Sequence, residues 1–455
     1  MIILAPAMHL TSRLRFPVKF AILAVIVLIP LTLLGLRAIN QINASIDTIR
    51  SEQVGQRYLL DVTPVLRLSM LQRALTNRVL SGDASGQGDL AANQAKLQEA
   101  FTKLEAIDRE LGATLETGDR VARLRTDAFQ LIEQAKGNAD QSAIFDAWND
   151  QIGKTLNFVY LISATSGMVL DEDYDSLFMI DQSTLRLPRQ INVVGQLRGL
   201  ASGLREGQPL STGTRSSLRV LLKQELQIRQ ELLQSLMLLR RNEPALADRL
   251  KAPIDSALQA LDSFRADLGR VLADTGSTIS GVQGLAANGN AVVADLYKAQ
   301  DVLQQELTAA LDHRTHERES DRALILAMFV CMGLLVAYVF AGIYGSMRKA
   351  IDEMLDATRR IAQGDLTAQV QVRGKDEMAD MGHGFNQMVQ AFRTSLTQVE
   401  HSSHAVSEAS LRLGASIDRA KQSMNGQQGE TEQVATAINE MTASVADVAQ
   451  NTEGA

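Results

Sequence analysis

Two uncharged stretches and a helical repeat of apolar positions organise this chain. No residue from Phe20 to Leu36 is charged, and none is charged from Ala323 to Met347. At a rise of about 1.5 Å per residue, the first stretch is about long enough to cross a hydrocarbon core roughly 30 Å thick, and the second is more than long enough. The pattern therefore predicts two transmembrane helices, at 16–37 and 323–347.

A cleaved signal peptide is the alternative for the first stretch, and a buried core helix is the alternative for the second. The signal peptide is disfavoured because Arg37 and a repeat of isoleucines continue a helix where a small-residue cleavage site would be expected.

Basic residues near each span predict how the chain is oriented in the membrane. They precede the first span at Arg13, Arg15 and Lys19, and they follow the second at Arg348, Lys349, Arg359 and Arg360. Both termini are therefore predicted to be cytoplasmic, with 1–15 as the N-terminal segment and 38–322 as a periplasmic domain.

The segment between the spans is predicted to be helical. Leu97, Phe101, Leu104, Ile107 and Leu111 fall at steps of three or four and so line one helix face. Turn-forming residues predict breaks at 81–88, 112–118, 171–175, 207–209 and 242–244. About six helices result, and the stretches 120–170 and 255–322 exceed the usual helix length. The expected arrangement is a pair of stacked four-helix bundles that share long helices.

Composition agrees with an all-α fold. The chain is 45% hydrophobic but only 4% aromatic, which suits long helices better than sheets. Its single cysteine, Cys331, lies in an apolar run, so neither a disulfide framework nor a cysteine metal site is expected. The formal net charge of -7 gives little support for nucleic-acid binding. Because no phosphate loop or hydrolase motif occurs, we expect no cofactor, no metal and no enzymatic activity.

The densest polar cluster in the predicted periplasmic domain runs from Asp171 to Arg189. It mixes carboxylates, a phenol and guanidinium groups that could bind a small polar solute. The competing interpretation is a helix-turn-helix in which Asp173 or Asp175 caps the next helix. On the first long helix, Arg67, Arg73 and Arg78 are alternative ligands for a carboxylate. The candidate ligand-binding residues are Arg186, Arg189, Asp175, Tyr174 and Arg78.

A helix, a connector and a second helix follow the second span. The first helix is amphipathic and ends at Gly364, Asp365 and Leu366, and the second opens at Asp376 and Glu377. This arrangement directly behind a membrane span resembles a HAMP domain, here over 348–400. The resemblance implies a dimeric, parallel four-helix coiled coil that converts small displacements of the membrane helix into altered packing.

Further along, small and apolar residues recur every seven positions, from Leu396 to Thr452. The run 431–449 resembles the first methylation helix of methyl-accepting chemotaxis proteins, with small residues around a modifiable Glu or Gln. The resemblance implies adaptation sites at Gln433, Glu440 and Glu432. Esterification or deamidation there would change the charge of a helix face and so tune repulsion between neighbouring helices. The competing interpretation of Glu440 is a solvated coiled-coil residue.

These features together resemble a bacterial methyl-accepting chemotaxis protein, multi-pass in the inner membrane and in contact with its lipid. The resemblance implies a homodimer that senses a small extracytoplasmic solute and, through HAMP and a signalling coiled coil starting at 401–455, controls a chemotaxis histidine kinase. An adaptor protein, a methyltransferase and a methylesterase would be its other partners. The family's kinase-contacting hairpin tip is not found before Ala455, so a truncated product or a chain without signalling output is also expected.

Two other functions compete. A fragment of a HAMP-containing sensor histidine kinase would need a phosphoacceptor histidine, and the surroundings of His401 and His404 do not match one. A membrane scaffold without signalling is the other. In size and helical character, the 38–322 segment is similar to the helical bimodular ligand-binding domains of some chemoreceptors.

Overall fold

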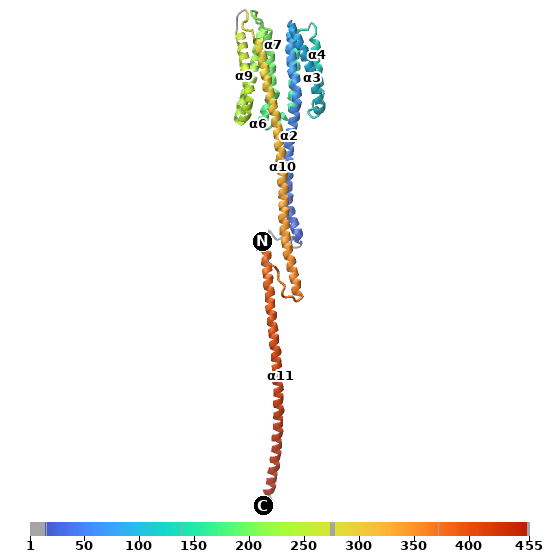
Figure 1. Ribbon diagram of the computed structural model, residues 1–455, viewed down its shortest axis with the longest axis vertical. Helices are drawn as coiled ribbons and strands as arrows, with labels where there is room; N and C mark the ends of the chain where they lie inside the picture. Colours follow the sequence, from blue (N-terminus) through green and yellow to red (C-terminus); the bar gives the residue numbers. More distant parts are fainter. Residues whose placement is uncertain (1–13, 15, 138, 274–277, 372, 453–455) are drawn as a thin grey trace. The chain divides into compact units, whose positions relative to one another are not determined.

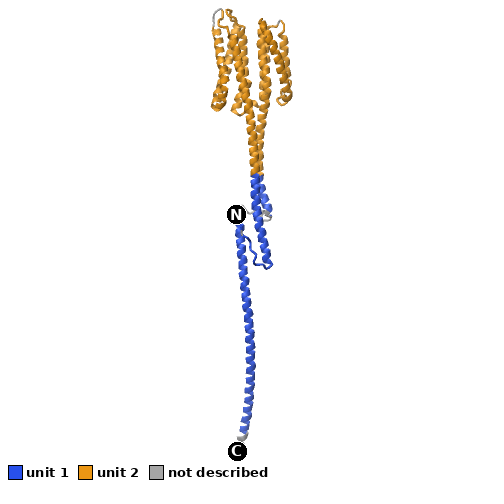
Figure 2. Cartoon of the chain, viewed as in Figure 1, with its two compact units in different colours: residues 1–28, 332–455 blue, residues 29–331 orange. Residues whose placement is uncertain are grey.

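The computed structural model describes every residue except 1–13, 15, 138, 274–277, 372 and 453–455, so the predicted N-terminal segment lies almost wholly outside the described residues. The described residues form helices and no strand, which confirms the all-α prediction. The chain divides into two units, one of residues 29–331 and one of residues 1–28 with 332–455 (Figure 2).

Residues 38–322, which we call the double-bundle domain, contain two bundles of helices (Figure 1). Short helix α6 (Tyr174–Ile180) and a π-helical turn at Asp181–Arg186 lead from the first bundle to the second. The first bundle consists of α2 (Phe16–Leu80), α3 (Gln87–Leu111), α4 (Arg120–Gln134) and α5 (Gln141–Thr165). The second consists of α7 (Leu187–Ser202), α8 (Thr212–Asn242), α9 (Pro244–Ala273) and α10 (Leu285–Ala362).

The predicted breaks fall between helices, but the two unusually long helices were a wrong prediction. The stretch 120–170 is interrupted between α4 and α5, where Asp140 accepts a hydrogen bond of 2.9 Å from the amide of Ser142 and so caps α5. The stretch 255–322 is interrupted between α9 and α10, where Gly281 and Gly284 adopt positive φ angles of 75° and 79°. Both interruptions depend on local turn chemistry that the apolar periodicity conceals.

The two bundles lie side by side, not end to end as the predicted stacking implied. Helices α2 and α10 run antiparallel and are joined along their length. Arg67 pairs with Asp301 at 2.6 Å, and nearer the uncharged stretches Arg50 pairs with Glu319 at 2.9 Å. These contacts run in opposite chain order, so the helices are antiparallel, and Figure 1 shows the helices of both bundles beside one another around them. Between these helices, buried Gln304 of α10 accepts a hydrogen bond of 3.1 Å from Gln56 at its backbone oxygen and donates one of 3.0 Å to Thr63.

A continuous apolar core fills both bundles. On α3, the predicted positions Leu97, Phe101, Leu104 and Ile107 are buried, as the helical spacing requires. The single tryptophan, Trp148, is fully buried on α5. Each fully buried side chain of this size contributes about 1.5–3 kcal/mol of hydrophobic stabilisation relative to exposure.

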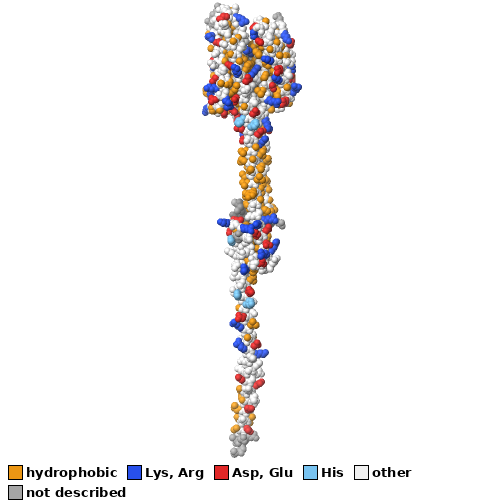
Figure 3. All heavy atoms as spheres, in the orientation of Figure 1, with side chains coloured by type: hydrophobic (Ala, Val, Ile, Leu, Met, Phe, Trp, Pro, Cys, Tyr) orange, Lys and Arg blue, Asp and Glu red, His pale blue; other side chains and the backbone are white. Residues whose placement is uncertain are grey.

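Within the described residues, α2 and α10 are long and apolar enough to cross a membrane. Their uncharged stretches expose large apolar side chains, for example Ile26 at 62% and Leu334 at 66% (Figure 3). Surfaces this apolar are stable in hydrocarbon and unfavourable in water. Pro30 lies within the first stretch, where a membrane helix tolerates it.

Candidate functional site

The structure does not bring the predicted ligand-binding residues together. Arg186 pairs with Asp181 and with Glu231 of α8. Arg78 lies at the end of α2, where its Nε donates a hydrogen bond of 2.7 Å to Asp83. The side chain of Arg189 is exposed. These arginines are therefore placed at separate positions of the domain and do not form one binding site.

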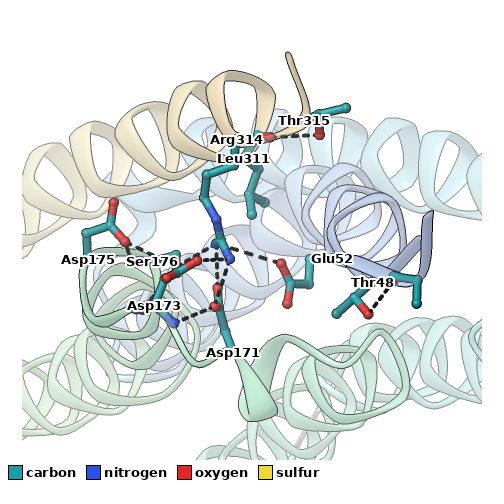
Figure 4. Close-up of polar contacts among 10 residues, drawn as sticks. Thr48, Glu52, Asp171, Asp173, Asp175, Ser176, Leu311, Arg314 and Thr315 are labelled. Atoms are coloured by element: carbon teal, nitrogen blue, oxygen red, sulfur yellow. Dashed lines mark hydrogen bonds and ion pairs between the residues drawn. The ribbon is translucent and has the colours of Figure 1, made fainter. Parts of the chain in front are cut away.

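The acidic residues of the same segment surround an arginine that the sequence analysis did not single out. Arg314 of α10 donates hydrogen bonds of 3.0 and 3.2 Å to the two carboxylate oxygens of Asp171, and it also pairs with Asp173. Its Nη1 lies 2.9 Å from Ser176 Oγ and 4.0 Å from Glu52 Oε2 of α2 (Figure 4). We call these five residues the Arg314 cluster.

The predicted residues Tyr174 and Asp175 lie beside this cluster, next to its member Asp173. Asp173 occupies the N-cap position of α6, but its side chain makes no cap hydrogen bond. Asp175 instead accepts a hydrogen bond of 2.7 Å from the amide of Ser176. Tyr174 is half-buried, and burial raises the pKa of its phenol. Asp171 and Asp173 of this segment therefore anchor α10, since both pair with the Arg314 guanidinium.

The most unusual charged residue of the domain is Arg73 on α2, whose side chain is 1% exposed. Its Nη1 donates to Asn149 Oδ1 at 2.6 Å and to Asn192 Oδ1 at 2.7 Å, while its Nε is buried without a partner. Within the part of the chain that the structure describes, no carboxylate pairs with it. Buried arginines normally have an acidic partner, because an isolated charge loses its hydration.

A second arginine intensifies this positive charge. Burial and the positive charge of Arg198 on α7 together lower the pKa of Arg73 to about 9. Arg198 donates to the amide oxygen of Asn290 at 3.0 Å, and burial also lowers its pKa. The ring of Phe145 on α5 lies 5.4 Å from the Arg73 guanidinium carbon. The site thus combines two cations with neutral acceptors.

Tyr297 of α10 also lies near Arg73 and Arg198. Its phenol is electrostatically coupled to Arg67, Arg73 and Arg198, and the Arg67 guanidinium stacks over its ring at 4.6 Å. Glycine makes room for this arrangement, because a Cβ at Gly195 would lie 2.8 Å from Arg73 Nη2. We call Arg73, Phe145, Asn149, Asn192, Arg198 and Tyr297 the buried-arginine site; its residues come from α2, α5, α7 and α10.

The sequence predicts Arg73 only as an alternative ligand for a carboxylate and gives no prediction for the other members of the site. A signal was present in α2, where the buried positions Leu59, Val62 and Leu66 continue at the same spacing to Arg73. An arginine in line with an apolar stripe is placed in the core. The asparagines have no comparable signal, since polar residues on α5 and α7 are common.

The predicted HAMP motif residues make local contacts that shape a connector. Gly364, with a φ of 94°, ends α10, and Asp365 accepts a hydrogen bond of 2.9 Å from the amide of Thr367. Hydrogen bonds from Thr367 and Arg360 hold the pKa of Asp365 down to about 2. Leu366 is half-buried beside them.

The second HAMP helix, α11 (Glu377–Thr452), begins with a cap. Asp376 accepts a hydrogen bond of 3.1 Å from the amide of Ala379, and Glu377 supplies a negative charge to the first turn. The Asn386 side chain binds the backbone of Val370 twice, accepting from its amide at 3.0 Å and donating to its carbonyl at 2.9 Å. The connector is thereby fixed along α11.

The predicted adaptation residues Gln433, Glu440 and Glu432 are exposed on α11. Large apolar side chains on the same helix are exposed as well, including Ile438 at 56% and Met441 at 64%. An apolar seam of this kind is stable only when another helix covers it.

Comparison with known proteins identifies residues 342–394 as a HAMP domain. The chain is 32% identical over 157 residues to the methyl-accepting chemotaxis protein PcaY of Pseudomonas putida, covering 33% of this chain and 28% of that protein. It is 24% identical over 219 residues to NahY of Pseudomonas putida, covering 44% and 39%. For McpA of Bacillus subtilis, the identity is 26% over 144 residues, covering 29% and 21%.

Among solved structures, that of the NasR transcription antiterminator aligns with a TM-score of 0.46 at 17% identity, covering 78% of this chain and 96% of that chain. The sequence relatives define the class. This is a HAMP-containing bacterial inner-membrane protein. More narrowly, it is a homologue of methyl-accepting chemotaxis proteins and matches 21% to 39% of the length of the three relatives above.

Proposed function

We propose that this protein is a transmembrane chemoreceptor that binds a small anion at the buried-arginine site. The observation that carries the proposal is Arg73, which is 1% exposed and has hydrogen-bond partners that are neutral. The double-bundle domain would face the periplasm, with 16–37 and 323–347 as the spans and both termini in the cytoplasm.

An anion accounts for the otherwise unfavourable charge. Removing an arginine from water without a counter-charge costs several kcal/mol, and a second arginine adds repulsion. An oxyanion would supply the missing negative charge and accept from the free Nε of Arg73. The guanidinium fork favours planar groups such as a carboxylate or a small inorganic oxyanion. We therefore expect a monovalent anion of few atoms.

A pocket next to the site offers a route for the ligand. It has a volume of about 270 Å³ and is lined by Phe145 of α5, by Gly199 and Leu200 of α7, and by polar residues at the end of α2. Phe145 belongs both to this pocket and to the buried-arginine site. A rotation of its ring would open the site to solvent.

The position of the site supports transmission. Its residues come from both bundles, and the two helices that carry Arg73 and Tyr297 are α2 and α10, which run on into the candidate spans. An anion between Arg73 and Arg198 would cancel their repulsion and draw the bundles together. Such a ligand shifts the conformational balance by as much as its affinity differs between the two arrangements.

The remaining steps follow from the relatives' class. A homodimer would cover the apolar seam of α11, and the HAMP domain would pass the change to a chemotaxis histidine kinase through an adaptor protein. A methyltransferase and a methylesterase would reset the receptor at Gln433, Glu440 and Glu432. The proposed anion ligand rests on the buried-arginine site alone and not on these relatives.

Thermal unfolding of the full chain in lipid nanodiscs, measured against a panel of inorganic anions and short carboxylates, tests the proposal. A ligand at a hundred times its Kd stabilises the folded state by about 2.7 kcal/mol. We expect one class of anion to raise the melting temperature of the wild type and of Arg186→Gln, the matched control, but not of Arg73→Gln. Stabilisation that disappears in Arg186→Gln and persists in Arg73→Gln would move the ligand to the segment first predicted from sequence.

A further inference from the structure

Glu52 is a buried acid that the anion site does not use. Its side chain is 1% exposed on α2, and its Oε2 makes no hydrogen bond. The charged groups that face it are Asp171 and Asp173, from the segment between α5 and α6, and Arg314 of α10 (Figure 4). All four belong to the Arg314 cluster.

Within the cluster, Arg314 donates its hydrogen bonds to residues other than Glu52. It binds both carboxylate oxygens of Asp171, it binds Ser176, and it pairs with Asp173. Glu52 remains 4.0 Å away, beyond hydrogen-bonding distance. Three carboxylates therefore share one guanidinium, and Glu52 is the one least stabilised as an anion.

The electrostatic consequence is a carboxyl group that holds its proton near neutral pH. Burial, together with the negative charges of Asp171 and Asp173 and against the positive charge of Arg314, raises the pKa of Glu52 to about 7. A buried carboxylate without hydrogen bonds is disfavoured relative to its neutral acid. The neighbouring charges set how strongly the proton is bound.

From this geometry we propose that the Arg314 cluster is a second sensory site whose ligand is the proton, so that the protein also responds to pH on the side of the membrane that the double-bundle domain faces. Glu52 takes one proton from solvent and becomes a neutral acid, and no other bond changes. The site does not depend on the anion or on Arg73.

Deprotonation changes the packing of α2. It places a negative charge on α2 opposite Asp171, and the two carboxylates then compete for the same guanidinium of α10. Close packing makes this contact sensitive, because the absent side chain of Gly55 lets Ser166 and Met168 approach α2 one turn beyond Glu52. Since α2 and α10 continue into the candidate spans, loss of the proton acts on the same two helices as the anion.

Infrared difference spectroscopy of the full chain in nanodiscs, titrated without added ligand anions, tests the proposal. We expect the carbonyl band of a protonated carboxyl group to disappear with a midpoint near neutral pH, well above the value of about 4.3 for an exposed glutamate. Glu52→Gln should remove this band. Glu319→Gln, which alters the half-buried glutamate of α10 that pairs with Arg50, should keep it.

A second variant tests the direction in which the midpoint of the Glu52 band shifts. Asp171→Asn removes a negative neighbour and should lower the midpoint of the Glu52 band, while leaving the band present. A band that survives in Glu52→Gln, a midpoint near the value for exposed glutamates, or a midpoint that Asp171→Asn leaves unchanged would each overturn the proposal. Because no ligand anion is present, these outcomes are independent of whether the buried-arginine site binds one.

Discussion

The positive charge of Arg198 acts directly on Arg73, and together with burial it holds the pKa of Arg73 at about 9. Both side chains donate their hydrogen bonds to asparagine oxygens, which carry no charge. The two residues belong to α7 and α2, and therefore to different bundles. Their repulsion opposes the packing of one bundle on the other, and the proposed anion would compensate it.

Neutralising the outer arginine should weaken anion binding without damaging the fold. Arg198→Gln removes one charge-assisted contact, worth about 1.5–3 kcal/mol, so the Kd for the anion should rise by about tenfold or more. The anion-free protein should be as stable as the wild type or slightly more stable, since repulsion of Arg73 is removed. Calorimetric titration measures both effects, with the exposed Arg189→Gln as control. An unchanged Kd in Arg198→Gln would exclude Arg198 from the site.

A methyl group at Gly195 should displace the Arg73 guanidinium within the same site. The new Cβ would lie 2.8 Å from Arg73 Nη2, so the guanidinium must move away from Asn149 and Asn192. We expect Gly195→Ala to reduce anion affinity several-fold. Gly269→Ala is the matched control, because it also lies in a helix but meets no atom within 4 Å, and it should stabilise by up to about 1 kcal/mol. Equal anion affinity in the two variants would contradict the described packing.

The stability of the double-bundle domain should fall as the pH rises towards neutrality. The pKa of Glu52 is raised from 4.5 to about 7 in the folded state, so between these values the unfolded chain has released a proton that the folded chain still holds. The free energy of unfolding should therefore decrease by about 3 kcal/mol from about pH 4.5 to about pH 7. Thermal unfolding across this range should show a flatter profile for Glu52→Gln and an unaltered one for Glu319→Gln. Identical profiles for wild type and Glu52→Gln would refute the assignment.

The HAMP connector should loosen when Asn386 is shortened. Its side chain satisfies both the amide and the carbonyl of Val370, and each bond contributes about 0.5–1.5 kcal/mol. Asn386→Ala should therefore speed hydrogen exchange at the Val370 amide by about tenfold, which mass spectrometry can follow. Thr394→Ala, an exposed change on the same helix, should leave that exchange rate unaltered.

Chemical modification of α11 tests the proposed adaptation residues. In cells that contain the methyltransferase, peptides spanning 425–452 should carry a methyl ester at Glu440 or Glu432, and in cells that also contain the methylesterase, a hydrolase, Gln433 should be deamidated. Cells without the enzyme provide the reference. Unmodified peptides from both strains would show that these exposed residues only keep the helix soluble.

The sequence predicted what depends on periodicity and misplaced what depends on tertiary contacts. The apolar stripe of α3 and the uncharged stretches of α2 and α10 were predicted, because burial and membrane insertion act on many residues at once. The candidate ligand site was placed at Arg186, because a dense polar cluster does not show which partners neutralise it. Asp181 and Glu231 already do so.

The residues of the buried-arginine site lie far apart in the sequence and meet only through packing. Arg73 and Asn149 are on one bundle, while Asn192 and Arg198 are on the other. The same reason conceals the Arg314 cluster, in which Glu52 and Arg314 belong to opposite ends of the domain's sequence. Only the side-by-side arrangement of α2 and α10 brings such residues together.

Isothermal titration calorimetry of the full chain in nanodiscs, with the anion selected by thermal unfolding, measures the central claim most directly. The account predicts saturable binding by the wild type, a Kd at least tenfold weaker for Arg73→Gln, and an unchanged Kd for Arg186→Gln and Arg78→Gln. Binding with full affinity by Arg73→Gln would contradict it, because the anion would then be held somewhere other than between Arg73 and Arg198.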